Sequence, residues 1–451
     1  ISPAGCQVLK MFLRTNKIGN FWHLFGQLGR CIFKMLTLRG ISLGVSNVKL
    51  IHLILVCAFV FYGSKAVSKD ELVFEEINLP VGNNAFEPSI FGTQNNELIM
   101  SWMEEDNGLV SINVAVLNNG KWSEPSQVSA SYDIYVNWAD FPSIVSLDDG
   151  TIIVHWLEKS GTSAYAYDIR VSLSQDKGAS WSSPFQPHLD RTIAQHGFVS
   201  ILPFKDTFIL FWLDARAYEG SLVERGAVEG AIQLRAAVYS KNGVVKPDFS
   251  LDLVACSCCK TSATMSEDTA IIAYRDRTPT EIRDISIKRM TNGVWSDAKT
   301  VHHDGWKIYG CPVNGPSIDA FDETVLAAWF TNANEKPEIK VAISRDGGVT
   351  FGRVRKIPSR RPIGHVNIKM LNGQTGIVSW LEWENSKEML KICKITLNGC
   401  MKPQVITVNS PHGSLNFPKI SATSSDFFIT WTQPLSDGRK TIKMLSAPLG
   451  N

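Results

Sequence analysis

The densest group of charged side chains lies at Tyr274-Arg275-Asp276-Arg277, and one more arginine, Arg216, precedes it in the chain. Guanidinium groups bind carboxylates through two parallel hydrogen bonds, and a neighbouring carboxyl group can donate or accept a proton. The sequence therefore indicates a site for an acidic ligand, with Arg216, Arg275 and Arg277 as the anion-binding side chains. The open alternative is that the arginines pair with aspartates and brace neighbouring parts of the fold.

Four cysteines fall in two segments, at Cys256, Cys258, Cys259 and Cys311. In an exported protein, cysteines form disulfides by default. Adjacent side chains of an extended segment point in opposite directions, so one of Cys258 and Cys259 is expected to join Cys311. A metal site that includes a histidine, or unpaired buried thiols, are the alternatives, and the spacing matches no zinc motif.

A second pair, Cys393 and Cys400, flanks the dipeptide Asn398-Gly399. A two-residue hairpin turn at this dipeptide pairs Leu397 with Cys400. Cys393 is then out of register, and no bridge between the two cysteines is expected.

A repeating unit positions these residues. Each unit opens with small or polar residues and a short apolar strand, and a strongly apolar second strand ends in an aromatic residue. The seven openings lie at residues 87–90, 141–144, 197–201, 260–263, 315–318, 365–368 and 417–420. The second strands end at Trp102, Trp156, Trp212, Tyr274, Trp329, Trp380 and Trp431. The spacing of roughly 50–60 residues is typical of β-propeller blades.

Seven openings predict an all-β propeller of seven four-stranded blades over residues 70–451, as a single domain. The last unit lacks a fourth strand. Residues 72–79 can supply it, which would close the ring and remove its open sheet edges. Six blades remain the alternative if one unit is atypical.

Two octapeptides, residues 174–181 and 344–351, read Ser-x-Asp-x-Gly-x-Ser/Thr-aromatic. The aspartate can accept backbone N–H groups of a hairpin turn, and the glycine can adopt a positive φ. The pattern resembles the Asp-box (BNR repeat) of the sialidase (neuraminidase) superfamily, whose members are β-propellers. The resemblance implies a structural role for Asp176, Gly178, Trp181, Asp346, Gly348 and Phe351. Sialidases have six blades, so the seven units depart from the family.

The resemblance also implies a set of roles at the site. Sialidases bind the substrate carboxylate with three arginines, use an aspartate as acid and base, and use a tyrosine as nucleophile. In this chain, Tyr309 is the candidate nucleophile, and the candidate acids or bases are Asp140, Glu158, Asp214 and Asp276. The family's Arg-Ile-Pro near the first blade is absent, because residues 85–89 read Ala-Phe-Glu-Pro-Ser. This absence weakens the prediction that the chain hydrolyses sialic acid.

In a propeller, the starts of first strands and the ends of second strands share one face, and binding sites favour loops on such a scaffold. The predicted ligand-binding residues on this face, besides the arginines, are His196, Asn314, Trp306 and His365. We expect one concave surface at blades three to five, lined by Asp214, Arg275, Asp276, Arg277, His196, Asn314 and the cysteines 258, 259 and 311. The alternative for any one of these charges is a solvated rim.

The net charge and the N-terminal sequence indicate which partners and which cellular location to expect. The formal net charge is +2 without a Lys/Arg run, so no nucleic-acid partner is expected. Residues 1–66 read as upstream sequence and a signal peptide, with an apolar core at about 50–62, a possible start at Met35 and cleavage near Ala66. This predicts a secreted or periplasmic protein without a transmembrane domain after cleavage. An uncleaved anchor is the alternative.

These patterns predict an exported, monomeric, sialidase-like propeller, with glycoside hydrolysis of an acidic sugar as the leading function. A non-catalytic propeller that binds glycan or protein is the second reading, and a metal-centred enzyme is a distant third. No cofactor is expected, although a metal at the cysteine and histidine face stays open. Free arginines beside a carboxyl pair would favour the enzyme, whereas arginines consumed in pairs between blades would favour the binding protein.

Overall fold

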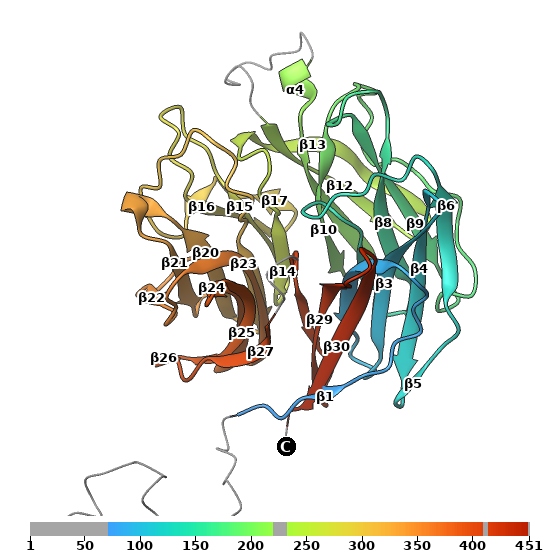
Figure 1. Cartoon of the computed structure of the whole chain (residues 1–451). Helices are drawn as coiled ribbons and strands as arrows, with labels where there is room; N and C mark the ends of the chain where they lie inside the picture. Colours follow the sequence, from blue (N-terminus) through green and yellow to red (C-terminus); the bar gives the residue numbers. More distant parts are fainter. Residues whose placement is uncertain (1–70, 220–231, 409–413, 450–451) are drawn as a thin grey trace, which may run out of the picture. The chain divides into compact units, whose positions relative to one another are not determined.

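The computed structural model describes residues 71–219, 232–408 and 414–449. The proposed upstream sequence and signal peptide lie outside these residues. Within the described ranges, seven antiparallel sheets follow one another along the chain, as the blades of a β-propeller (Figure 1). No helix in the same ranges is long and apolar enough to cross a lipid bilayer.

The strands of each blade follow the order of the chain. Blade one contains β2 (Ala85–Gly92), β3 (Leu98–Asp106), β4 (Leu109–Asn118), β5 (Lys121–Trp122) and β6 (Ser126–Ser131). Blade two contains β7 (Ser143–Ser146), β8 (Ile152–Lys159) and β9 (Tyr167–Ser174). Blade three contains β10 (His196–Phe204), β11 (Thr207–Asp214), β12 (Ile232–Ser240) and β13 (Gly243–Ala255), with the short helix α4 (Arg216–Glu219) after β11.

The remaining blades repeat the pattern. Blade four contains β14 (Ser262–Ser266), β15 (Thr269–Arg275), β16 (Ile285–Thr291), β17 (Val294–Trp295) and β18 (Lys299–Thr300). Blade five contains β19 (Ser317–Phe321), β20 (Thr324–Thr331), β21 (Glu338–Ser344) and β22 (Arg355–Lys356), with the 3₁₀ turn η2 (Ala333–Glu335) after β20. Blade six contains β23 (Pro362–Asn372), β24 (Thr375–Glu384), β25 (Lys387–Thr396), β26 (Gly399–Cys400) and β27 (Gln404–Val408). Blade seven contains β28 (Lys419–Ala422), β29 (Asp426–Pro434) and β30 (Lys440–Pro448).

The predicted closure of the ring is confirmed. Strand β1 (Glu75–Glu76) pairs with β30 in the last blade, where Glu75 lies opposite Ser446 and Glu76 opposite Leu445. Blade two departs from the expected four strands, because its fourth strand is reduced to one bridge between Val171 and Phe185. Pro184 and Pro187 flank that bridge, and a proline has no N–H with which to extend a ladder.

The tryptophans of the second strands are buried anchors, and each strand continues past its tryptophan. Their indole N–H groups bond to the polar residue two positions later in five blades, because residues i and i+2 of a strand share a face. The pairs are Trp102–Glu104 at 2.7 Å, Trp156–Glu158 at 3.1 Å, Trp212–Asp214 at 2.7 Å, Trp380–Glu382 at 3.1 Å and Trp431–Gln433 at 3.2 Å. In blade five, Asp304 comes from a preceding loop to accept the indole of Trp329 at 2.6 Å.

The two octapeptides form the same turn. Asp176 accepts both the backbone N–H and the hydroxyl of Ser180, at 2.9 and 2.5 Å, and Asp346 accepts the same groups of Thr350, at 2.8 and 2.6 Å. The glycine of each turn has a positive φ, 90° at Gly178 and 81° at Gly348. These bonds give both aspartates a structural task.

The register of the β25–β26 hairpin corrects one expectation. Ile395 lies opposite Cys400 and Thr396 opposite Gly399, so the two-residue turn falls on Leu397 and Asn398, one position earlier than predicted. Cys393 and Cys400 then have Cα atoms 5.8 Å apart and form a disulfide. The prediction of no bridge was wrong because it placed Gly399 inside the turn, whereas this glycine begins β26 with a φ of 104°.

Candidate functional site

The guanidinium group of Arg275 is hydrogen-bonded to backbone carbonyl groups. Its guanidinium donates to the carbonyl oxygens of Asn314 at 2.8 Å, Arg283 at 2.6 Å and Phe330 at 2.7 Å. The side chain is only 1% exposed and packs 4.7 Å from the ring of Trp306, itself buried. Arg275 and Trp306, both predicted to bind ligand, are therefore buried inside the protein. Arg275 holds the loop before β19 and the end of β20 against blade four.

Arg277 and Arg283 share one carboxylate. The Nη2 atom of Arg277 lies 2.6 Å from Oε1 of Glu281, and Nη2 of Arg283 lies 2.8 Å from its Oε2. These bonds tie the loop after β15 to itself and leave Glu281 with two cationic partners.

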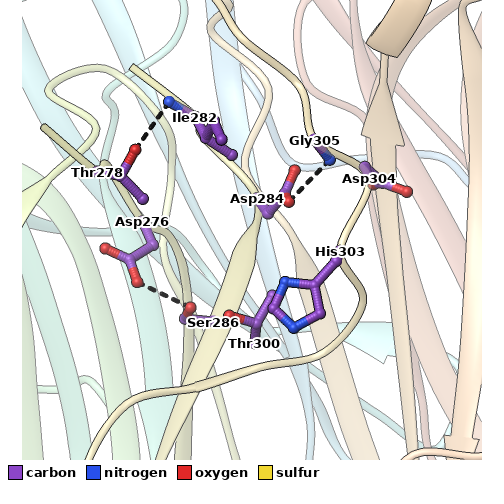
Figure 2. A pocket seen from close by; sticks show the side chains of 9 residues that line it. All are labelled: Asp276, Thr278, Ile282, Asp284, Ser286, Thr300, His303, Asp304 and Gly305. Atoms are coloured by element: carbon purple, nitrogen blue, oxygen red, sulfur yellow. Dashed lines mark hydrogen bonds between the residues drawn. The ribbon is translucent and has the colours of Figure 1, made fainter. Parts of the chain in front are cut away.

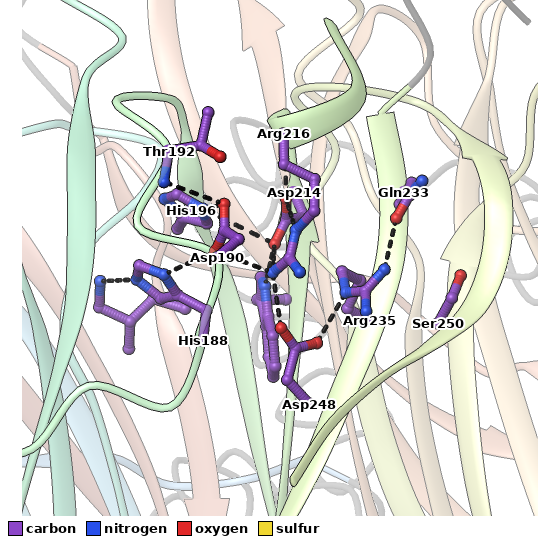
Figure 3. Close-up of polar contacts among 12 residues, drawn as sticks. His188, Asp190, Thr192, His196, Asp214, Arg216, Gln233, Arg235, Asp248 and Ser250 are labelled. Atoms are coloured by element: carbon purple, nitrogen blue, oxygen red, sulfur yellow. Dashed lines mark hydrogen bonds and ion pairs between the residues drawn. The ribbon is translucent and has the colours of Figure 1, made fainter. Parts of the chain in front are cut away.

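Arg216 is held by three aspartates (Figure 3). Its Nη2 atom lies 2.7 Å from Asp214, 2.7 Å from Asp248 and 3.1 Å from Asp190, and Arg235 binds Asp248 from the other side at 2.7 Å. Burial raises the pKa of Asp214, but the bonds from Arg216 outweigh it and lower the pKa overall. The predicted acid Asp214 and the predicted anion-binding Arg216 thus neutralise each other.

His196 belongs to the same network, and its ring stacks on that of His188 with centroids 3.7 Å apart and 6° between the planes. Burial disfavours the charged imidazole of His196, yet bonds to Asp168 and Asp190 raise its pKa to about 9. A nitrogen from each ring and Asp168 come within 4.8 Å of one another. Imidazole binds a metal in the plane of its ring, and two parallel stacked planes cannot both contain one ion. The stacked rings therefore do not fit a shared metal ion.

Asp140 is a buried, closed-off carboxyl, 2% exposed. It accepts the backbone N–H of Phe198 at 2.7 Å and the hydroxyl of Tyr167 at 3.1 Å. Burial raises its pKa to about 7 against the opposing effect of these two bonds. A Cβ at Gly197 would stand 2.0 Å from Oδ2, so only glycine admits the carboxyl at this position.

The remaining predicted residues at strand openings link the blades to one another. Asn314 accepts the N–H of His365 at 2.9 Å, His365 Nδ1 bonds the carbonyl of Asn416 at 2.8 Å, and Asn416 donates to Glu87 at 2.6 Å. Glu87, His365 and Asn416 all have positive φ angles between 51° and 54°. Such strained residues persist only where the surroundings hold them in place. Tyr309, in contrast, is 78% exposed.

The cysteine cluster joins the openings of blades four and five. Cys258 and Cys311 form a disulfide, with Cα atoms 6.0 Å apart. Cys256 and Cys259 are buried thiols, with their sulfur atoms 2.9 Å apart. The contact with Cys259 and the charge of Arg275 lower the pKa of Cys256 to about 6 despite burial.

Asp276 lines a pocket formed by blade four and the loop that leads from it to blade five (Figure 2). The cavity has a volume of about 320 Å³, at the lower end of the size range of small-molecule sites. Its lining comprises Asp276, Thr278, Ile282, Asp284, Ser286, Thr300, His303, Asp304 and Gly305. The three charged groups are carboxylates, and the single histidine is exposed to solvent.

The carboxyl of Asp276 differs from its neighbours in how it is held. It accepts only the hydroxyl of Ser286, at 2.9 Å, and the N–H of Arg277, at 2.7 Å, and has no cation within 4.0 Å among the described residues. Burial, followed by the nearby charge of Asp252, raises its pKa above the ordinary value. Asp252 lies on β13 and accepts the hydroxyl of Tyr274.

The other two carboxylates of the pocket are fixed in orientation. Asp284 accepts the backbone N–H groups of Gly305 at 2.9 Å and Trp306 at 3.1 Å. Asp304 accepts the indole of Trp329 and the ammonium of Lys340, both at 2.6 Å. The pocket therefore combines one carboxyl with an elevated pKa and two that are positioned by donors.

The structure brings together few of the predicted site residues. Asp276 alone among them lines this pocket, whereas Asp140, Glu158 and Asp214 are engaged elsewhere. Glu158 accepts the indole of Trp156 and the guanidinium of Arg170, at 2.8 Å. The sequence analysis gave no role to the pocket residues Asp284 and Asp304, and it considered His303 only as one of the histidines that could join a metal site at the cysteines.

No known family model matches the chain, and no curated protein matches it. Solved structures to which it is similar include the polysaccharide lyase Uly1, with 10% identity over 80% of this chain and 90% of that one and a TM-score of 0.48. Phage phi92 endosialidase has 11% identity over 85% and 70% of the two chains and a TM-score of 0.44. The NanB sialidase of Streptococcus pneumoniae has 10% identity over 83% and 94% and a TM-score of 0.44. The likeness concerns the sialidase-like propeller fold, and at these values it carries no argument about activity.

Proposed function

We propose that this propeller is a glycoside hydrolase whose active site is the pocket formed by blade four and the loop that follows it. The observation that carries the proposal is Asp276, a carboxyl with a raised pKa in a small-molecule cavity that it shares with two oriented carboxylates. Glycosidases use such a pair, in which one carboxyl keeps its proton to protonate the leaving oxygen and the other acts as base or nucleophile.

Each residue has a chemical task in this proposal. Asp276 is the general acid, because burial and the charge of Asp252 favour its protonated form and outweigh its two hydrogen bonds and the charge of Lys288. Asp284 is the second carboxylate, held toward the cavity by Gly305 and Trp306. Thr278, Thr300 and His303 supply hydrogen-bonding groups for sugar hydroxyls.

The charge of the pocket changes the expected substrate class. The described lining contains three carboxylates and no arginine or lysine. An acidic sugar would meet like charge there, which disfavours binding. The arginines predicted to bind its carboxylate are bonded to backbone carbonyls, aspartates or a glutamate instead. We therefore propose a neutral or amino sugar rather than sialic acid.

The test is a hydrolysis screen of the purified protein with aryl glycosides of neutral sugars, amino sugars and sialic acid. We expect turnover of a neutral or amino sugar and a loss of about 10²–10⁴-fold in kcat in Asp276→Asn, the usual contribution of a general acid. Glu281→Gln is the matched control, because it is a nearby carboxyl outside the pocket lining. Absence of turnover on every glycoside, or full activity of Asp276→Asn, would refute the proposal.

A second function, glycan binding without catalysis, is favoured by one observation. Trp138 is 45% exposed and stacks on the buried ring of Phe417, and Tyr132 and Tyr165 are 68% and 66% exposed. Aromatic faces of this kind are common contacts for sugar rings. Binding of an oligosaccharide that Trp138→Ala weakens, together with an inactive pocket, would support this function over hydrolysis.

A further inference from the structure

Two pairs of cysteines meet where the loops that lead into β14 and β19 come together. The inner pair, Cys256 and Cys259, consists of free thiols whose residues are 0% and 1% exposed. The outer pair, Cys258 and Cys311, is a disulfide. Cys258 is half-buried, and Cys311 is exposed to solvent. The oxidised pair therefore reaches the surface, whereas the reduced pair does not.

The sulfur atoms are close enough to exchange partners. Sγ of Cys256 lies 2.9 Å from Sγ of Cys259, roughly 0.9 Å more than the length of a disulfide bond. The sulfur atoms of these two residues and of Cys258 all lie within 4.8 Å of one another. In disulfide exchange, a thiolate attacks one sulfur of a disulfide and expels the other. Here the sulfur of Cys258 is within reach of a thiol, and the sulfur to be expelled belongs to the exposed Cys311.

The surroundings favour Cys256 as the attacking residue. Its Sγ atom lies 3.4 Å from Nη1 of Arg283. The contact with Cys259, followed by the charges of Arg275 and Arg283, lowers the pKa of Cys256 to about 6 against the opposing effect of burial. Burial and the contact with Cys256 raise the pKa of Cys259. Because the thiolate is the nucleophile in disulfide chemistry, Cys256 attacks and Cys259 keeps its proton until the second step.

A metal ion is the other kind of ligand that clustered cysteines bind. Metals bind cysteine as the thiolate, which a disulfide sulfur is not. With the outer pair bonded, the cluster offers only Cys256 and Cys259, too few for a structural zinc site. The arrangement is therefore better suited to exchange between sulfur atoms.

We propose that these four cysteines form a thiol–disulfide exchange site, in which the disulfide moves from the outer pair to the inner pair. The Cys256 thiolate attacks Sγ of Cys258, the bond between Cys258 and Cys311 breaks, and Cys311 leaves as a thiolate that takes up a proton. The sulfur of Cys259 then attacks Sγ of Cys256 and displaces Cys258. The inner pair is oxidised by two electrons and the outer pair is reduced by two, and the two protons of the inner pair pass to the outer pair. The balance needs no oxidant from outside the protein.

The exchange changes what the surface offers to other molecules. It releases the thiol of Cys311, which makes the loop before β19 a modification site for electrophiles and for the disulfides of other molecules. It also replaces a link between two loops, with a sequence separation of 53, by a link across three positions of a single loop. This site is separate from the pocket of Asp276 and does not depend on the proposed hydrolysis.

The test follows the cysteines of the native full-length protein by mass spectrometry, without added reductant. N-ethylmaleimide traps thiols that reach the surface, and a deuterated maleimide labels the remaining thiols after unfolding. Trypsin leaves the inner pair and Cys258 in one peptide, residues 242–260, and Cys311 in another, residues 308–340. The two peptides should be cross-linked at the start. With time, we expect Cys311 to gain the first maleimide while the peptide 242–260 acquires an internal disulfide.

A variant and an internal control identify the attacking sulfur. In Cys256→Ser, labelling of Cys311 should be at least about tenfold slower, because the remaining thiol of Cys259 ionises less readily. The disulfide between Cys393 and Cys400 is the matched control within the same molecule. Neither free thiol of the described residues belongs to its hairpin, so it should stay unlabelled over the same time.

The inference is overturned if the cross-linked peptides are absent at the start, if Cys311 stays unlabelled in the wild type, or if Cys256→Ser is labelled as fast as the wild type. The first two measurements use the wild type alone, so they decide the matter even if the serine variant does not fold.

Discussion

Replacement of Arg275 by methionine tests whether this arginine stabilises the fold or binds a ligand. The guanidinium makes three bonds to the carbonyl groups of Asn314, Arg283 and Phe330, and the side chain is 1% exposed. Hydrogen bonds from charged groups contribute about 1.5–3 kcal/mol each. Methionine keeps much of the packing on Trp306 but leaves the three carbonyl groups without this donor. We therefore expect the free energy of unfolding to fall by about 4–5 kcal/mol, near the lower end of the summed contribution of three such hydrogen bonds.

This loss should be visible in a thermal melt. A propeller of roughly 380 residues has an unfolding entropy of about 0.8 kcal/mol per kelvin, so the melting temperature should fall by about 5–6 °C. Arg277→Met is the control, because its partner Glu281 lies on the same loop, both side chains keep contact with solvent, and ion pairs near the surface contribute about 1 kcal/mol or less. The reasoning is refuted if Arg275→Met melts with the wild type, or if its folded fraction loses affinity for a ligand that the wild type binds.

Three further perturbations test other parts of the structure. Asp140 has a pKa of about 7 in the folded protein, so the native state keeps a proton that the unfolded chain releases. The free energy of unfolding should therefore fall as the pH rises from about 4 to 7. Asp140→Asn should remove about 4 kcal/mol of this pH dependence, measured as the difference between denaturant melts at the two pH values. Glu158→Ala should destabilise the protein by about 1–3 kcal/mol more than Glu158→Gln in the same melts, because only alanine leaves the indole of Trp156 without an acceptor. Equal losses of stability in the two variants would contradict a stabilising role for this indole hydrogen bond. Asp346→Ala should speed hydrogen exchange of the Thr350 amide, because this amide donates to the carboxylate of Asp346. Unchanged protection of the amide would contradict the structural role given to this aspartate in the turn.

The arrangement of blades could be predicted because it is a repeated local pattern. Each of the seven apolar second strands contains a buried aromatic residue at an equivalent position, and the incomplete last unit pointed to the residues that contain β1. The role of the residue two positions after each tryptophan was also within reach of the sequence. Strand alternation places Glu158 beside Trp156 and Asp214 beside Trp212, and this argument would have identified both carboxylates as indole acceptors.

The site could not be predicted in the same way because its contacts are distant in the sequence. Arg275 bonds to carbonyls near Asn314 and Phe330, whose positions depend on how blade five packs against blade four. Asp304 reaches the pocket because Trp329 lacks an acid two residues later and takes one from the preceding loop instead. A sequence pattern shows which residues can carry charge, but it does not show which donors or acceptors neutralise them.

Most of the charged side chains predicted to bind ligand have partners of opposite charge or backbone carbonyl groups within the protein. Asp276 is an exception, because its carboxyl has a raised pKa and no cationic partner within 4.0 Å in the described ranges. An uncompensated buried charge destabilises a fold unless a ligand or a reaction uses it. The same physical criterion that removes Arg216 and Arg275 from the list of ligand-binding residues therefore selects Asp276 for proton transfer.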